Sequence, residues 1–244
     1  MIDIGRVIAL WHYPVSTMAG HEIPTLTVTP QGVPGDRQFG LFDRETGQIA
    51  DPARDGRWRP ILEITSRVTS AGTLELKLPD GDWQSAETMD EALSRFMGFP
   101  VELRRYDDPA PKPGVDIQGA RNRYQPSPIH LLTTASLAAL KALHPAGQAD
   151  PRRFRPNIFV EMDEMPGSFP ETEWIGRDLL IGEERLTITE PTRRCGLTIQ
   201  SQTDLAHDPD ILRHLVRNNG HNIGVYCVPE RAITIRTGDR VQLV

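Results

Sequence analysis

The residue in this sequence best suited to chemistry is Cys195, which follows two adjacent arginines, Arg193 and Arg194. Guanidinium groups close to a sulfur favour its thiolate form, which attacks electrophiles or binds a soft metal ion. A free cysteine is also commonly a small buried hydrophobe whose charged neighbours face the solvent. The sequence around Cys195 therefore allows a reactive thiol or a structural one, and the rest of the chain must decide.

Other arginines stand where strands are expected to begin or end. Of the 27 basic residues 24 are arginine, and Arg37, Arg153 and Arg155 lie beside expected strands. Arginine recognises phosphate and carboxylate through a planar fork, although a coding bias would give the same composition. If these arginines converged on Cys195, the site would bind an anionic, phosphate-bearing molecule.

Several familiar cysteine sites fit poorly. A phosphatase-type cysteine needs an arginine a few residues after it, and residues 196–201 contain none. A cysteine hydrolase needs a histidine base, for which the spacing does not choose between His207, His214 and His221. Two cysteines 32 residues apart do not form a zinc ligand set. Glycine-rich phosphate loops are absent as well.

The composition is that of a soluble globular protein. The net charge of -6 argues against general nucleic-acid binding. No apolar run is long enough to span a membrane, and the N-terminal residues lack the apolar core of a signal peptide. We therefore expect a cytoplasmic protein with no membrane or nucleic-acid partner, in which Cys195 and Cys227 are both free thiols and Cys227 belongs to the core.

The pattern of short strands predicts how Cys195 is positioned. Residues 179–189 read as a hairpin whose second strand leads to Cys195, which then sits at a strand end. A helix capped by Thr133 or Thr134 is expected to end before residue 145, and another is expected to begin at residues 208–210 and close at 219–220. A third is expected after Thr88, which with Glu91 matches a capping box. Residues 51–60 read as a surface loop with solvated charges.

The fold class follows from these elements. Many short strands with about three helices, and no sustained strand-helix alternation, favour a mainly β (α+β) fold of the barrel kind with helices outside. The prolines and acids of residues 107–114 mark an internal boundary, which divides the chain into 1–106 and 107–244. Residues 121–128 suit either a plain connecting loop or a mobile loop over a site.

Several of these motifs are similar to those of the MOSC family, named after the C-terminal domain of molybdenum cofactor sulfurases. The similar runs in the second part are residues 155–158, 174–182, 191–198, 224–226 and 235–239. In the first part, residues 13–15, Gly20 and 32–37 resemble the β-barrel domain that precedes MOSC in those sulfurases and in amidoxime-reducing proteins. The resemblance spans nearly the whole chain and implies a β-barrel-like MOSC fold for 107–244 and an N-terminal β-barrel domain for 1–106.

The resemblance also implies a cofactor and a site. It makes Cys195 the catalytic cysteine and a ligand of molybdenum in a molybdopterin-type cofactor. The cofactor-binding residues that it implies are Thr17, Arg37, Arg155, Asn157, Thr192, Arg193, Arg194 and Thr198. The family usually has lysine and serine where this chain has Ser16 and Thr17, and often aspartate where it has Ser201.

The function implied by the resemblance is a molybdenum-dependent oxidoreductase that reduces N-hydroxylated small molecules. Its electrons would come from a separate protein of the ferredoxin, flavodoxin or cytochrome type, since no iron-sulfur ligand cluster is present. Two alternatives stay open at this point. One is sulfur transfer or carbon-sulfur cleavage by a persulfide on Cys195, without molybdenum or pyridoxal phosphate, and the other is a non-catalytic carrier of the cofactor.

Overall fold

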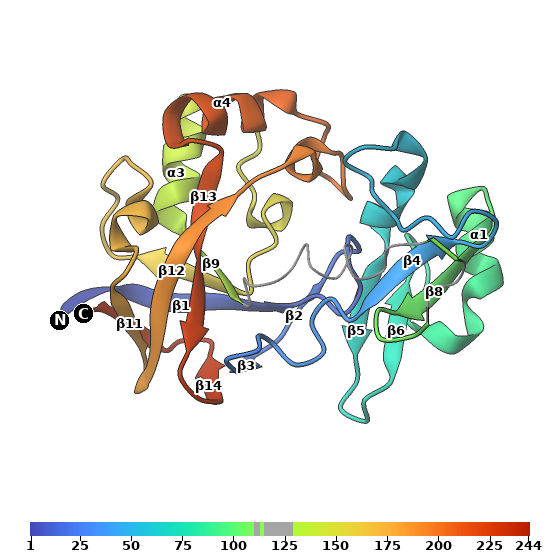
Figure 1. The fold of residues 1–244 in the computed structure, drawn as a ribbon. Coiled ribbons are helices and arrows are strands. Elements are labelled where there is room, and N and C mark those ends of the chain that lie inside the picture. Colours follow the sequence, from blue (N-terminus) through green and yellow to red (C-terminus); the bar gives the residue numbers. More distant parts are fainter. Residues whose placement is uncertain (110–112, 115–128) are drawn as a thin grey trace.

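The computed structural model describes residues 1–109, 113–114 and 129–244. The expected loop at 121–128 and part of the expected boundary at 107–114 lie outside these residues. The described chain forms two lobes that lie side by side, with both termini together at the far end of one of them (Figure 1).

A closed barrel of seven strands forms the lobe that carries the termini. Its order is β10-β9-β13-β12-β11-β15-β1, and pairing of β1 with β10 closes the ring. The strands are β1 (Ile2–His12), β9 (Ile129–Thr133), β10 (Ile158–Met162), β11 (Asp178–Ile181), β12 (Glu184–Arg193), β13 (Asn222–Pro229) and β15 (Arg240–Leu243). Only β9 and β10 pair in parallel among the seven. The mainly β, barrel-type fold expected from the sequence is confirmed.

The barrel interior is filled by alternate residues of its strands, as the two-residue period of a strand requires. On β12, Leu186 and Ile188 face the core while Arg185 and Thr189 do not, and Leu179 and Ile181 of β11 join the same apolar cluster. A two-stranded ribbon of β3 (Thr25–Val28) and β14 (Ile233–Arg236) and the short β2 (His21–Glu22) adjoin the barrel.

Two helices pack outside the barrel. Helix α3 (Thr134–Leu143) begins at Thr133, whose side chain accepts from the Ser136 amide, and α4 (Pro209–Asn219) begins at Asp208 in the same way. Gly220 ends α4 in the left-handed conformation. Both expected helices and their caps are confirmed. No helix in the described ranges is long and apolar enough to cross a membrane.

The second lobe is built mainly from residues 39–105. A pair of strands, β4 (Phe39–Asp43) and β8 (Val101–Arg105), lies with a three-stranded sheet of β5 (Thr65–Val68), β6 (Leu74–Lys77) and β7 (Gln84–Ser85). These strands and α1 (Asp90–Met97) enclose a separate apolar core that contains Trp58 and Leu93. The first strand of the chain nevertheless belongs to the barrel, so residues 1–106 contribute to both lobes.

Two details of this lobe differ from the sequence-based expectations. Helix α1 starts after Met89 with no side-chain cap, because the preceding residues form a 3₁₀ turn, η2 (Ala86–Thr88), in which the Thr88 hydroxyl donates to the Ser85 carbonyl. The capping box is therefore wrong. Residues 51–60 are also not wholly a solvated loop, because η1 (Gly56–Glu63) buries Trp58.

Candidate functional site

A cavity of about 850 Å³ lies where residues of the two lobes meet. Its wall takes Thr17, residues 31–34 and 36–38, residues 51–54 and Tyr106 from the first part of the chain. From the barrel lobe it takes His130, residues 153–155, Asn157, residues 193–195, Leu197, Thr198 and Tyr226. Chain segments far apart in sequence therefore form one concave surface of the size typical of ligand sites.

Cys195 stands at this wall with an exposed thiol. It lies two residues after Arg193, the last residue of β12, and immediately precedes the 3₁₀ turn η5 (Gly196–Ile199). Both the amide and the hydroxyl of Thr198 donate to the Cys195 carbonyl, at 3.2 and 2.9 Å. The turn fixes the backbone at the cysteine and leaves the sulfur accessible, which confirms the expected place of Cys195 at a strand end.

Arg194 has its guanidinium turned into the protein. It donates to the carbonyls of Phe154 and Ile223 at 3.0 and 3.2 Å, and Nη2 lies 2.6 Å from Nε2 of His130. Burial lowers the pKa of Arg194 to about 10, so the group stays charged at neutral pH. Burial, followed by the Arg194 charge, holds the pKa of His130 well below its usual value, and the neutral imidazole can accept from Arg194.

Arg153 is almost wholly buried, with 1% of its surface exposed. Its guanidinium donates to the carbonyls of Gln148, Thr198, Gln200 and Ala206 at 2.7 to 3.3 Å. These carbonyls belong to the segment before η3 (Pro151–Arg153) and to the segment that follows Cys195. Arg153 therefore holds the turn after the cysteine in place.

Two further arginines enclose the ring of Tyr13. The guanidinium carbons of Arg37 and Arg155 lie 4.8 and 4.3 Å from the ring centroid. Arg155 also donates to the Met18 carbonyl at 2.6 Å, and the Arg155 carbonyl accepts from Arg37 at 3.3 Å. The ring and these bonds give both guanidinium groups a fixed place at the cavity.

Asp36 and Asn157 join the two parts of this cluster. Asp36 forms an ion pair with Arg37 and accepts from the Tyr13 amide at 2.7 Å. The Asn157 side-chain amide donates to Asp36 and to the Trp11 carbonyl, both at 3.3 Å, and its oxygen accepts from the His130 amide. At the cavity wall Asn157 therefore connects three segments: strand β1, strand β9, and the loop that precedes β4.

The backbone is unusual at this wall. Thr17, Arg37 and Arg155 have φ values of 68°, 52° and 54°, in the left-handed region that residues with a side chain seldom adopt. Each such residue costs about 1 kcal/mol or more and persists only where its surroundings hold it. Three of them at one cavity indicate that the chain sacrifices some stability to shape this surface.

Eight of the nine site residues named from the sequence line this cavity: Cys195, Thr17, Arg37, Arg155, Asn157, Arg193, Arg194 and Thr198. Thr192 is the ninth. It is fully buried on β12, and its hydroxyl has no hydrogen-bond partner among the described residues. The roles of the nine in binding a cofactor stay predictions.

The sequence reasoning did not select three features of the wall. His130 and Tyr226 come from the neighbouring strands β9 and β13, which pair through these two residues. Residues 51–54 were read as solvated, whereas Arg153 was among the arginines considered for convergence on Cys195, and it does line the cavity. The sequence signal for Tyr226 was the similarity of residues 224–226 to a family motif.

Two other sequence-based candidates are placed elsewhere. Cys227 lies in the barrel core, where burial raises the pKa of its thiol to about 12, so it is the core residue that was expected. None of His207, His214 and His221, weighed as bases for a cysteine hydrolase, lines the cavity.

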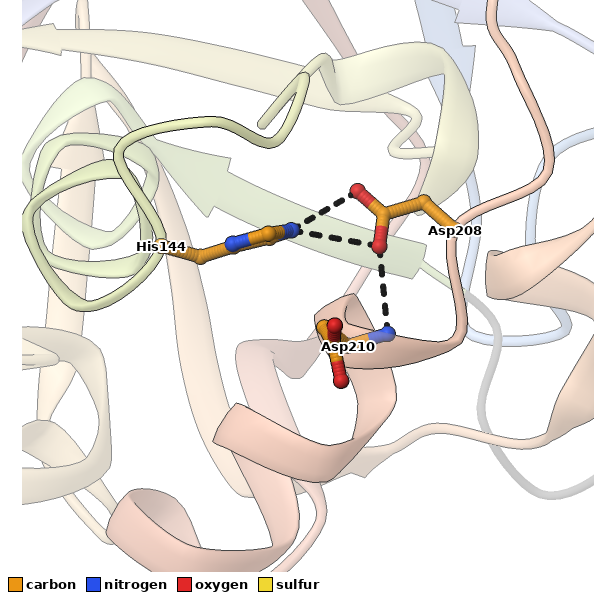
Figure 2. Close-up of side chains that lie close together, drawn as sticks. All are labelled: His144, Asp208 and Asp210. Carbon is orange, nitrogen blue, oxygen red and sulfur yellow. Dashed lines mark hydrogen bonds and ion pairs between the residues drawn. The ribbon is translucent and has the colours of Figure 1, made fainter.

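A separate cluster of His144, Asp208 and Asp210 lies between α3 and α4 (Figure 2). Their ligating atoms lie within 4.8 Å of one another, but each group has a structural partner. His144 bonds to the Asp208 carboxylate at 2.9 Å, Asp208 caps α4 by accepting from the Asp210 amide, and Asp210 pairs with Arg213. A cation would also face the positive end of the α4 dipole. The cluster joins two helices.

Comparisons with known proteins agree with this architecture. The crystal structure of the YuaD protein from Bacillus subtilis aligns over 98% of this chain and 95% of its own, with a TM-score of 0.51 and 13% identity. The YiiM protein from Geobacillus stearothermophilus aligns over 48% of this chain and 54% of its own, with a TM-score of 0.37 and 14% identity. At 13% identity the likeness to YuaD concerns the fold alone, and the YiiM alignment, with its lower TM-score, supports no conclusion about this chain. No curated protein sequence matches the chain.

Family models identify both parts of the sequence. The model of the MOSC N-terminal beta barrel domain matches residues 4–102, and the model of the MOSC domain matches residues 116–242, which is more than half of the chain. The expected family is thereby confirmed, and the chain is a member of the MOSC family with a MOSC N-terminal beta barrel domain.

Proposed function

We propose that the cavity binds the molybdenum cofactor and that Cys195 is the protein ligand of molybdenum. The observation that carries this proposal is the exposed Cys195 thiol at a cavity whose wall also holds guanidinium groups from both lobes. The donor set fits the cofactor, because a thiolate is a soft ligand and guanidinium forks suit its phosphate. The MOSC family is associated with this cofactor.

The arginines at Tyr13 would hold the phosphate and the pterin. Arg37 and Arg155 are fixed on the ring of Tyr13 before any ligand arrives, so little side-chain freedom is lost on binding. Thr17 and Asn157 extend the same wall. Asn157 would act partly by orienting its neighbours, since its amide already bonds to Asp36 and Trp11.

The residues around Cys195 would keep the metal side of the site in shape. Arg194 ties the end of β12 to His130 and to the Phe154 carbonyl, and Thr198 closes the turn after the cysteine. Thr192 would act from behind the wall, because it is buried and does not line the cavity. Arg193 is exposed and lines the cavity two residues before Cys195.

The reaction we infer is the reduction of N-hydroxylated compounds. When bound, the cofactor would supply the two-electron redox step in which the N–O bond breaks, two protons are taken up and water leaves. The two electrons would come from a separate protein of the ferredoxin, flavodoxin or cytochrome class.

Turnover of an amidoxime tests this function. Protein purified from a host that makes the cofactor should convert benzamidoxime to benzamidine with a chemically reduced viologen dye as the electron source. The Cys195→Ser variant should lose this activity. Arg59→Gln, which changes an exposed arginine outside the cavity, should retain it. Molybdenum-loaded protein that produces no benzamidine would contradict the reaction and favour a carrier.

The exposed thiol also supports a second candidate, sulfur transfer through a persulfide on Cys195. Cyanolysis would release thiocyanate from such a persulfide. Sulfane sulfur on wild-type protein, absent from Cys195→Ser and found without molybdenum, would favour this candidate over the oxidoreductase.

A further inference from the structure

Two arginines of the cavity differ from the rest because their side chains are exposed. The Arg54 side chain is 86% exposed, and Arg193 is exposed at the end of β12. Arg153, Arg155 and Arg194, in contrast, donate to backbone carbonyls of the protein. Arg54 has one ion pair, with Asp51 at 3.8 Å, which is a weak surface contact. The Arg193 side chain has no hydrogen bond or ion pair to any residue that the structure describes.

Both exposed arginines belong to the wall around Cys195. Arg193 precedes the cysteine by two residues on β12. Residues 51–54 of the other lobe lie against the residue after it, because a Cβ atom added to Gly196 would be 3.5 Å from the Ala53 carbonyl oxygen. Exposed arginines of both lobes therefore line the same cavity as the exposed Cys195 thiol.

The charges of the wall leave these two groups available to a ligand. Among the lining residues that the structure describes, there are six arginines and three aspartates, Asp36, Asp51 and Asp107. Asp36 is used by Arg37 and by the Tyr13 amide. The cofactor phosphate would be held by Arg37 and Arg155, which lie at Tyr13, whereas Arg54 and Arg193 make no comparable contacts.

We infer that the substrate of this site carries an anionic group, a carboxylate or a phosphate ester, which Arg54 and Arg193 bind beside Cys195. The inference rests on the proposed function for the reaction that the substrate undergoes. The preference for an anion rests only on the two exposed guanidinium groups, so it can be tested without the cofactor.

Alkylation of Cys195 in cofactor-free protein measures this preference. Anionic iodoacetate and neutral iodoacetamide both transfer a carbon to sulfur and release iodide, so the ratio of their rates reports the local field. Cys227 is buried in the core, and labelling of the Cys195→Ser variant measures how much alkylation occurs at Cys227. Because the whole chain carries a net charge of -6, its average field disfavours iodoacetate. We expect the iodoacetate to iodoacetamide ratio to exceed that of a neutral free thiol and to fall with salt.

Single variants identify the groups responsible. Arg54→Gln and Arg193→Gln should each lower the rate ratio about threefold, as expected when one charge that acts on the sulfur through water is removed. Arg59→Gln is the matched control, because it removes the same charge from an exposed arginine five residues after Arg54 that does not line the cavity. The inference would be overturned if the rate ratio were unchanged in both Arg54→Gln and Arg193→Gln, or if it fell equally in Arg59→Gln.

Protection by small anions distinguishes the two ligand chemistries. Benzoate and phenyl phosphate are added during labelling with iodoacetamide, and protection by one of them identifies the carboxylate or the phosphate ester as the preferred group. Protection should be lost in Arg54→Gln and Arg193→Gln, and protection by neither compound would overturn the inference. Failure of molybdenum binding would leave these results unaffected, so the inference and the proposed function fail separately.

Discussion

At the scale of single residues, Arg193 and Arg194 have the same chemistry but opposite surroundings. Arg193 is exposed, whereas Arg194 is enclosed by His130 and two backbone carbonyls. Successive side chains of a strand point to opposite faces, so two neighbours at a strand end are expected to differ in this way. The sequence alone does not reveal which of the two faces inward.

The two arginines should respond differently to the same substitution. Arg194→Gln should lower the free energy of unfolding by about 3 kcal/mol, because it leaves buried acceptors without a charged donor. Arg193→Gln should change it by no more than about 0.5 kcal/mol, as is usual at an exposed position. Urea unfolding of both variants measures the difference, and equal losses would contradict the inward position of Arg194.

At the scale of elements, the packing of β13 on β9 depends on a glycine. Gly224 has a φ of 75°, and a Cβ atom there would lie 2.4 Å from Nε2 of His130 and 2.5 Å from the Leu131 carbonyl oxygen. The absence of a side chain at 224 therefore lets His130 reach Arg194. This explains why residues 224–226 belong to the site although only Tyr226 lines the cavity.

Replacing two glycines by alanine, one at a time, separates the cost of backbone strain from the cost of a clash with His130. Gly176 has a φ of 83° with no atom within 4 Å of its added Cβ, so Gly176→Ala should destabilise the protein by about 1 kcal/mol. Gly224→Ala adds a steric clash and should cost about 3 kcal/mol in total. Thermal or urea unfolding gives both values. Equal losses would mean that β13 can move away from His130 without penalty.

Elements with strong local signals could be predicted from the sequence. The Thr133 and Asp208 caps, the glycine after α4 and the alternation in β12 depend on residues close in sequence, and the structure confirms them. The capping box at Thr88 failed because a 3₁₀ turn competed for the same hydroxyl. The burial of Trp58 was missed because its apolar partners come from distant strands and α1.

At the scale of the whole molecule, the site depends on contacts between distant segments. Arg37 donates to the carbonyl of Arg155, 118 residues away, and the Thr203 amide donates to Glu63 of the other lobe at 2.6 Å. No periodicity in a single sequence shows such convergence. The family motifs selected eight wall residues before their geometry was known, but not the wall formed by residues 51–54, because no motif contains it.

One buried and two half-buried histidines should make the whole molecule sensitive to acid. The pKa values of His12, His21 and His130 are all lowered, with burial as the largest cause. Below pH 6.5 the unfolded chain therefore binds protons that the folded protein does not, and stability falls as the pH falls. Each such histidine contributes a slope of up to about 1.4 kcal/mol per pH unit.

The variant His130→Gln isolates one of these contributions. Its free energy of unfolding should be lower than that of the wild type at pH 7.5, where it lacks the His130 contacts. Between pH 6.5 and 5.5 it should decline less steeply, because one buried histidine no longer resists protonation. Urea unfolding across this range tests the sign, and an identical slope in both proteins would contradict a neutral, buried His130.

The central claim is that the cavity holds molybdenum through Cys195, and the most direct test is the metal content of the purified protein. Protein from a host that makes the cofactor is analysed for molybdenum and for the fluorescent pterin product. We predict close to one of each per chain, with molybdenum lost in Cys195→Ser and retained in Arg59→Gln. Wild-type protein from the same host that carries neither molybdenum nor pterin would contradict the account.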